Sequence, residues 1–137
     1  MYKSILLAAD GSDNSFRAAE ETLNFSDENT QVTILNVINA DESKNDVLHS
    51  GPSESITAKR KEKLSTIIEL YESNNIHHTV IFEHGVPNET VVKVANSGDY
   101  QAVVLGTRGL NSLQEMVLGS VSHKVAKRAD IPVIIVK

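Results

Sequence analysis

Residues 102–120 read AVVLGTRGLNSLQEMVLGS, which is an apolar run, a glycine-containing loop and the start of a helical pattern in succession. The glycines stand at positions 106, 109 and 119, and the helical pattern begins at Ser120. Glycine lets backbone N–H groups approach an anion closely, and the first N–H groups of a helix have no partner within it. Because the positive end of the helix dipole lies beside them, these groups favour phosphate. The stretch predicts a phosphate site, with a nucleotide as the expected ligand.

Glycines also end strands and helices for purely structural reasons. The spacing of these three glycines therefore leaves both interpretations open, and the rest of the chain has to distinguish them.

The same alternation of apolar runs and helical patterns extends along the whole chain. Strands are predicted at 4–9, 31–38, 77–83, 101–105 and 131–136. Helices are predicted at 12–25, 53–73, 87–95 and 120–128, with a long polar loop at 39–53. This alternation predicts an α/β fold, a doubly wound parallel sheet with helices on both faces. The length of 137 residues and the absence of a repeat or linker predict a single domain, 1–137.

The predicted sheet suggests where a ligand binds. A doubly wound sheet binds ligands at the carboxyl ends of its strands, where the winding reverses. Asp10 ends the first strand and Gly106 ends the fourth. The residues do not reveal the strand order, but an order of 3-2-1-4-5 would make these strands neighbours. Asp10, Gly106, Gly109 and Ser120 would then share one crevice.

Composition narrows the class of protein. The chain has no cysteine, so it has no disulfide and no thiolate metal site, which fits a reducing compartment. No apolar run approaches the roughly 20 residues of a membrane span, and the first residues do not resemble a signal peptide. The net charge of −5 opposes nucleic-acid binding, and the cationic cluster at 59–63 is interpreted as a solvated helix face. A cytoplasmic protein without nucleic-acid or membrane partners is expected.

The sequence resembles the universal stress protein family along its whole length. The residues that carry the resemblance are Ala8-Ala9-Asp10-Gly11-Ser12, Val37, Gly85-Val86-Pro87, Gly106-x2-Gly109-x9-Gly119-Ser120 and the segment 131–136. In that family the glycine motif marks the ATP-binding members. The resemblance implies a five-stranded sheet of order 3-2-1-4-5, an adenine nucleotide in the crevice and a homodimer paired through the last strand, 131–137.

The resemblance also implies roles for individual residues. Ala8, Ala9 and Asp10 would lie beside adenine and ribose, and the backbone of Val37 would meet the adenine edge. The sugar would be flanked by Leu105 and Gly106. The phosphates would be surrounded by Gly109, Gly119, Ser120, Val121 and Ser122. The chain departs from the common family pattern at Asn36, where histidine is frequent, and at Thr107-Arg108, where Ser-His or Ser-Arg is frequent.

Several of these residues have alternative interpretations. Asp10 could accept hydrogen bonds from ribose or hold a divalent cation such as Mg or Mn, or it could cap the following helix together with Ser12. Ser120 is expected to cap its helix whether or not phosphate is bound. Arg108 could neutralise phosphate charge or be solvated.

The histidines offer little for metal or acid–base chemistry. His77 and His78 are adjacent on a strand and point to opposite faces, so they cannot share a ligand. No His-Glu-x-x-His arrangement involves these residues or His84. His123, one turn after Ser120, is the best-placed candidate for proton transfer.

The missing motifs point to binding rather than rapid catalysis. The chain has no P-loop lysine, no Gly-x-Gly-x-x-Gly after the first strand and no serine nucleophile elbow. We therefore expect an ATP-binding dimeric sensor or regulator with little turnover, whose stress role comes from the resemblance alone. Two alternatives stay open: a slow ATPase or phosphotransferase using Asp10, a metal ion and Arg108, and an interaction module with an empty crevice.

The last strand is the edge of a 3-2-1-4-5 sheet. A bare apolar edge strand invites pairing with other chains. Two alternate residues of 133–136 are expected to face the domain's own core, and the other two to need cover from a two-fold partner.

Overall fold

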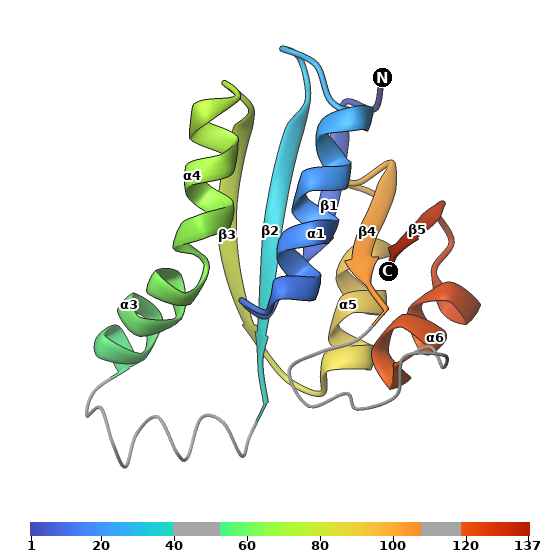
Figure 1. Cartoon of the computed structure of the whole chain (residues 1–137). Coiled ribbons are helices and arrows are strands. Elements are labelled where there is room, and N and C mark those ends of the chain that lie inside the picture. The colour runs from blue at the N-terminus through green and yellow to red at the C-terminus, as the bar shows by residue number, and fades with distance from the viewer. Residues whose placement is uncertain (40–52, 108–118) are drawn as a thin grey trace.

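The computed structural model describes residues 1–39, 53–107 and 119–137, and the side chains of all of these except 53–57. Five parallel strands form one sheet of order β3-β2-β1-β4-β5 (Figure 1). The strands are β1 (Ser4–Ala8), β2 (Gln31–Ile38), β3 (His77–His84), β4 (Ala102–Gly106) and β5 (Val133–Val136). The predicted α/β class and the order 3-2-1-4-5 are confirmed.

Helices cover both faces of the sheet. The helices α1 (Asp13–Thr22) and α4 (Ser65–Ser73) lie on the face toward the viewer in Figure 1, and α5 (Pro87–Ala95) and α6 (Ser120–Arg128) lie on the other. A short 3-10 turn, η1 (Leu23–Phe25), follows α1, and α3 (Ser53–Lys63) precedes α4. The carboxyl ends of the strands form the lower edge of the sheet in Figure 1, and α3 lies at that edge.

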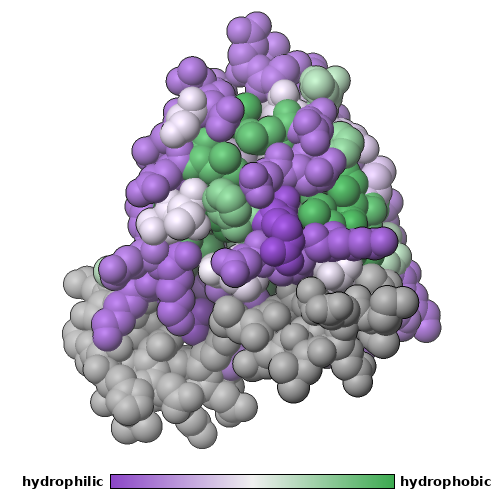
Figure 2. Space-filling view, in the orientation of Figure 1, coloured by the Kyte–Doolittle hydropathy of each residue, from purple (hydrophilic) through white to green (hydrophobic). Residues whose placement is uncertain are grey.

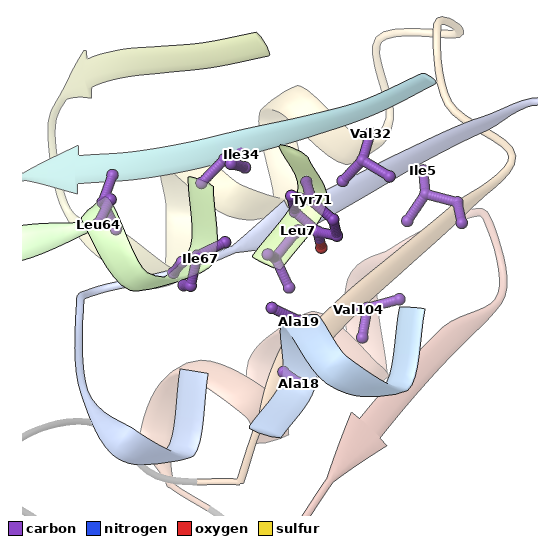
Figure 3. Packing of buried hydrophobic residues seen from close by; sticks show 11 residues of the cluster. Ile5, Leu7, Ala18, Ala19, Val32, Ile34, Leu64, Ile67, Tyr71 and Val104 are labelled. Atoms are coloured by element: carbon purple, nitrogen blue, oxygen red, sulfur yellow. The ribbon is translucent and has the colours of Figure 1, made fainter. Parts of the chain in front are cut away.

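Each face of the sheet has its own hydrophobic core. Figure 3 shows the first core, in which strand side chains meet Ala18 and Ala19 of α1 and Ile67 and Tyr71 of α4. The second core joins Leu6, Leu35, Val103 and Leu105 of the sheet to Val91, Ala95 and Val125 of the helices. Successive strand residues point to opposite faces, so a sheet buried on both faces requires unbroken apolar runs. This requirement explains why β1, β2 and β4 were recognisable in the sequence.

Several element boundaries shift by one residue, the helix predicted at 12–25 ends in the 3-10 turn η1, and two further differences have a clear physical reason. The helix predicted at 53–73 is two helices, because Leu64 leaves helical geometry at φ −94° and ψ 4° and is fully buried. The last strand starts at Val133 rather than at position 131. Pro132 has no N–H to donate to a strand ladder, although its carbonyl accepts a bond from the Val103 N–H at 3.0 Å.

One buried polar pair joins α4 to α1. The Thr22 hydroxyl donates to the Ala19 carbonyl at 2.6 Å, and the Tyr71 hydroxyl lies 2.7 Å from the Thr22 Oγ1 and donates to it. Tyr71 is fully buried, and this burial raises the pKa of its phenol, with the Thr22 hydrogen bond acting in the opposite direction.

We expect this phenol to make stability depend on alkaline pH. Above about pH 10 the unfolded chain ionises Tyr71 while the folded chain keeps it neutral, so the folded state binds the extra proton. Its contribution is complete below pH 10 and is lost at about 1.4 kcal/mol per pH unit above that value. Urea unfolding of the wild type and of Tyr71→Phe at a series of alkaline pH values should give a steeper decline for the wild type. Equal slopes would contradict this expectation.

Candidate functional site

The edge formed by the carboxyl ends of the strands brings together segments that are far apart in the sequence. The strands β1 and β4 are neighbours, with Leu7 paired to Val104, and the winding of the sheet reverses between them. Asp10 follows β1 and Gly106 ends β4, so both lie at the edge where the winding reverses. The helices α1 and α6 begin at the same edge (Figure 1). The predicted crevice therefore has the required topology, whereas Arg108 and Gly109 lie outside the described residues.

Asp10 shapes the turn between β1 and α1. Its Oδ1 accepts a hydrogen bond from the Ser12 N–H at 2.9 Å, across Gly11, whose φ is +86°. The helix cap itself is Ser12, whose Oγ accepts from the Ser15 N–H at 3.2 Å. Of the two roles considered for Asp10, the cap shared with Ser12 is only partly present: Ser12 caps, and Asp10 holds the turn through one oxygen. A carboxylate has a second oxygen, which suits Asp10 to accept from a ligand as well.

Gly106 makes room for the first turn of α1. A Cβ at this position would overlap Oδ1 of Asn14, a buried residue that sequence reasoning did not single out. The Asn14 Nδ2 donates to the carbonyl of Val136 at 3.4 Å, so the same side chain joins α1 to β5. Gly106 therefore has a packing role in addition to the predicted place beside a sugar.

We expect Gly106→Ala to be destabilising by about 1–3 kcal/mol, the usual cost of overpacking. Adding Asn14→Ala to that variant should recover part of the loss, because it removes the atom with which the new methyl group collides. Chemical denaturation of both single variants and the double variant measures the coupling. Strictly additive losses would show that the collision with Asn14 is not the cause.

The loop that carries the glycine motif has its two ends joined. The Gly119 N–H donates to the Thr107 carbonyl at 2.6 Å. The Ser122 Oγ lies 3.1 Å from the Thr107 carbonyl oxygen and 3.0 Å from that of Gly119. Because Ser122 is almost completely buried, its hydroxyl serves to fix the end of β4 against the start of α6. Its predicted contact with phosphate remains a prediction.

The cap of α6 is Gly119, not Ser120 as predicted. Gly119 has the extended backbone angles of a cap, φ −63° and ψ 159°, while Ser120 is already the first helical residue and is exposed. Gly119 has no side chain, so α6 has no side-chain cap hydrogen bond. The N–H groups that a side chain on the cap residue would satisfy are those of Val121 and Ser122, and groups of this kind at a helix start suit an anion.

The apolar residues predicted around adenine and ribose are all at this end of the sheet but also belong to its cores. Ala9 packs in the first core, and Leu105 is buried in the second. Ala8 and Val37 are half-buried and pack against the second core, as does Val121 of α6, which was predicted near the phosphates.

Arg60 is the site-proximal residue that sequence reasoning missed. Lys59, Lys61 and Lys63 are exposed as predicted for a solvated face, but Arg60 is only 7% exposed. Its Nη1 donates to the Asn36 Oδ1 at 3.1 Å, and the Asn36 Nδ2 donates to the carbonyl of Ala9 at 2.9 Å. Asn36 was the available signal, since an amide within a buried apolar strand requires hydrogen-bond partners.

The histidines and carboxylates do not assemble a metal centre within the described ranges. No group of three His, Cys, Asp or Glu residues there is close enough to hold a metal ion. His77, His84 and His123 are exposed, and His78 is half-buried with its ring 5.7 Å from that of Tyr71. In the part of the chain for which helices are described, none has both the length and the apolar character to cross a membrane.

Comparison with known proteins gives a consistent result. Residues 1–137 match the sequence profile described as "Universal stress protein family". Universal stress protein MJ0531 of Methanocaldococcus jannaschii is 30% identical, with 100% of this chain and 83% of that protein covered. YxiE of Bacillus subtilis, also a universal stress protein, is 29% identical over the full length of both chains.

Solved structures agree with the sequence relatives. The structure of MJ0577, a protein of M. jannaschii, superposes with a TM-score of 0.84 at 29% identity and covers 100% of this chain and 96% of its own. A universal stress protein solved in complex with cAMP has the same fold, with a TM-score of 0.73 at 23% identity and coverage of 99% and 97%. Sequence, topology and fold lead to one conclusion: this chain belongs to the universal stress protein family.

Proposed function

We propose that this protein binds ATP at the carboxyl edge of its sheet and acts in the cytoplasm as a stress-linked sensor or regulator. The observation that carries the proposal is the junction of Thr107 with Gly119. It brings the end of β4 to the start of a helix that has no side-chain cap. Such a helix start presents backbone donors and positive dipole charge where the winding of the sheet reverses, which suits a phosphate.

The residues present fit an adenine nucleotide. The N–H groups at the start of α6, with Gly119 and Ser120 beside them, would hold the phosphates. Asp10 would accept from the ribose hydroxyls or hold Mg or Mn bound to the phosphates, since carboxylate oxygens suit both roles. One solved member of the family contains cAMP, so the fold accommodates an adenine nucleotide in that protein.

Dimerisation through β5 is the second part of the proposal. In the observed sheet β5 is an edge strand. Contrary to expectation, both of its faces pack on the domain's own cores: Ile134 and Val136 on the first, Val133 and Ile135 on the second. All four residues stay half-buried, and Figure 2 shows hydrophobic surface on the side of the molecule where β5 lies. A second copy pairing along this edge would cover that surface and satisfy the edge of the strand.

The direct test is mass spectrometry of nucleotide carried through purification, followed by calorimetric titration with ATP. Bound adenine nucleotide and saturable one-to-one binding are expected. A protein that carries no nucleotide and shows no binding heat would support the interaction-module alternative instead.

We expect turnover to be slow. The sequence has no P-loop motif with its phosphate-binding lysine, and the described groups at this edge include backbone donors and the Asp10 carboxylate. Phosphate release under excess ATP with Mg or Mn should stay well below about 10 per second, the median rate of enzymes. A rate at or above that value would favour the ATPase or phosphotransferase alternative.

A further inference from the structure

The turn that carries Asp10 is supported from outside by helix α3 at two points. On the side of Ala9, the Arg60 guanidinium donates to Asn36, and Asn36 donates to the Ala9 carbonyl. On the side of Gly11, a Cβ would lie 3.0 Å from the Lys63 carbonyl oxygen, a tight contact that shows how closely the end of α3 approaches this turn. Gly11 also has φ +86°, which favours glycine. The residues on both sides of Asp10 thus contact α3 directly or through Asn36.

The burial of Arg60 is costly unless it is compensated. Arginine is almost never fully buried without partners, because a buried charge loses its hydration. Arg60 is in the last turn of α3, yet its exposed neighbours Lys59 and Lys61 show that the helix has solvent-facing positions for a cation. A guanidinium is more weakly hydrated than the ammonium of lysine, so arginine is the cation better suited to this buried hydrogen bond to Asn36.

Asn36 transmits this contact to the strand end. Its Oδ1 accepts from Arg60 and its Nδ2 donates to Ala9, so the orientation of the amide is determined by the two bonds together. Without Arg60 the amide could turn over, and the Ala9 carbonyl would lose its donor. Asp10 follows Ala9 directly, and its carboxylate orients the turn by binding the Ser12 N–H.

We propose that Arg60 is a positioning residue for Asp10: acting through Asn36, it sets the geometry with which the Asp10 carboxylate meets the nucleotide. This inference rests on the proposed function. By thermodynamic reciprocity, nucleotide bound at Asp10 also stabilises the docking of α3.

The test compares Arg60→Met with a matched control, Lys61→Met, which removes the same charge from an exposed neighbour on the same helix. Methionine keeps an apolar side chain of similar length without the charge, and circular dichroism checks that the variant folds. Two properties are measured on each full-length variant: ATP affinity by calorimetry, and the amide resonances of Gly11 and Ser12 by NMR without nucleotide. Arg60→Lys is included to measure how much of the affinity a lysine restores.

For Arg60→Met we expect ATP affinity to fall about tenfold, the size of one charge-assisted hydrogen bond. The Gly11 and Ser12 resonances should shift, and Arg60→Lys should recover part of the affinity. Lys61→Met should match the wild type in both measurements. Asn36→Ala should resemble Arg60→Met, and the double variant should be no weaker than either single variant.

An ATP affinity in folded Arg60→Met equal to that of Lys61→Met would overturn the inference, as would unchanged Gly11 and Ser12 resonances. If Arg60→Met fails to fold, hydrogen exchange of the wild type decides: ATP should slow exchange of the amides at 58–63, and unchanged exchange would overturn the inference. If the wild type binds no ATP, the proposed function fails, and the NMR comparison alone decides whether Arg60 positions the turn.

Discussion

Gly119→Val should abolish ATP binding and leave the fold intact. Gly119 caps α6 at the junction with Thr107, where the proposed phosphate approaches the helix start. Its φ of −63° and ψ of 159° are accessible to valine, so neither backbone strain nor loss of the helix is expected. The branched side chain would stand beside the N–H groups of Val121 and Ser122. We expect affinity to fall about a hundredfold or more, which corresponds to at least about 2.7 kcal/mol.

Calorimetry with ATP, together with the far-ultraviolet circular dichroism and Tm of each variant, checks this result. Gly119→Ala is the graded control. Alanine can adopt the same backbone angles as valine but is smaller, so the loss of ATP affinity should be smaller. If folded Gly119→Val binds ATP with an affinity within twofold of the wild type, phosphate does not bind at this helix start. The equivalent prediction for Gly109 concerns a residue outside the described ranges.

Ile135→Asp should convert a dimer into a monomer and also lower stability. Ile135 pairs with Leu105 in the sheet and packs, half-buried, against the second core. A carboxylate there loses hydration and apolar contact, and we expect a loss of about 2–4 kcal/mol in the free energy of unfolding. In a two-fold strand pair the new charge would also face the partner's edge, where the same charge is repeated.

Ile135→Ala separates these two effects. It removes most of the apolar contact with the second core but adds no charge to the edge, so it should be less stable than the wild type and still dimeric. Sedimentation at micromolar concentration measures both variants and the wild type. A monomeric wild type would refute dimerisation through β5, and a dimeric Ile135→Asp would move the interface elsewhere.

The sequence by itself determined the architecture of this protein. A sheet buried on both faces needs unbroken apolar strands, so the apolar runs of β1, β2 and β4 could be recognised as strands. Ser12 was recognisable as a cap from the turn signal before it, and Pro87 was recognisable as the first residue of a helix. The family resemblance supplied the strand order, which periodicity alone does not contain.

Local signals also placed the parts of the candidate site. Strand ends and helix starts are properties of short segments, and topology requires the ends of neighbouring parallel strands to lie at one edge. Asp10, Gly106 and Gly119 could therefore be assigned to one region before their contacts were known. Whether those residues bind nucleotide stays a prediction.

Only the tertiary structure decided how the site is supported. Arg60 looked like one cation among Lys59, Lys61 and Lys63, but it is buried and donates a hydrogen bond to Asn36, 24 residues away. The Asn36 contact with Ala9 spans 27 residues, and the Asn14 contact with Val136 spans 122. The cap at Gly119 likewise depended on a backbone bond to Thr107 across the loop. Periodicity and propensity describe the residue and its near neighbours, whereas the burial of a charge or the room for a Cβ depends on which distant segment packs against it.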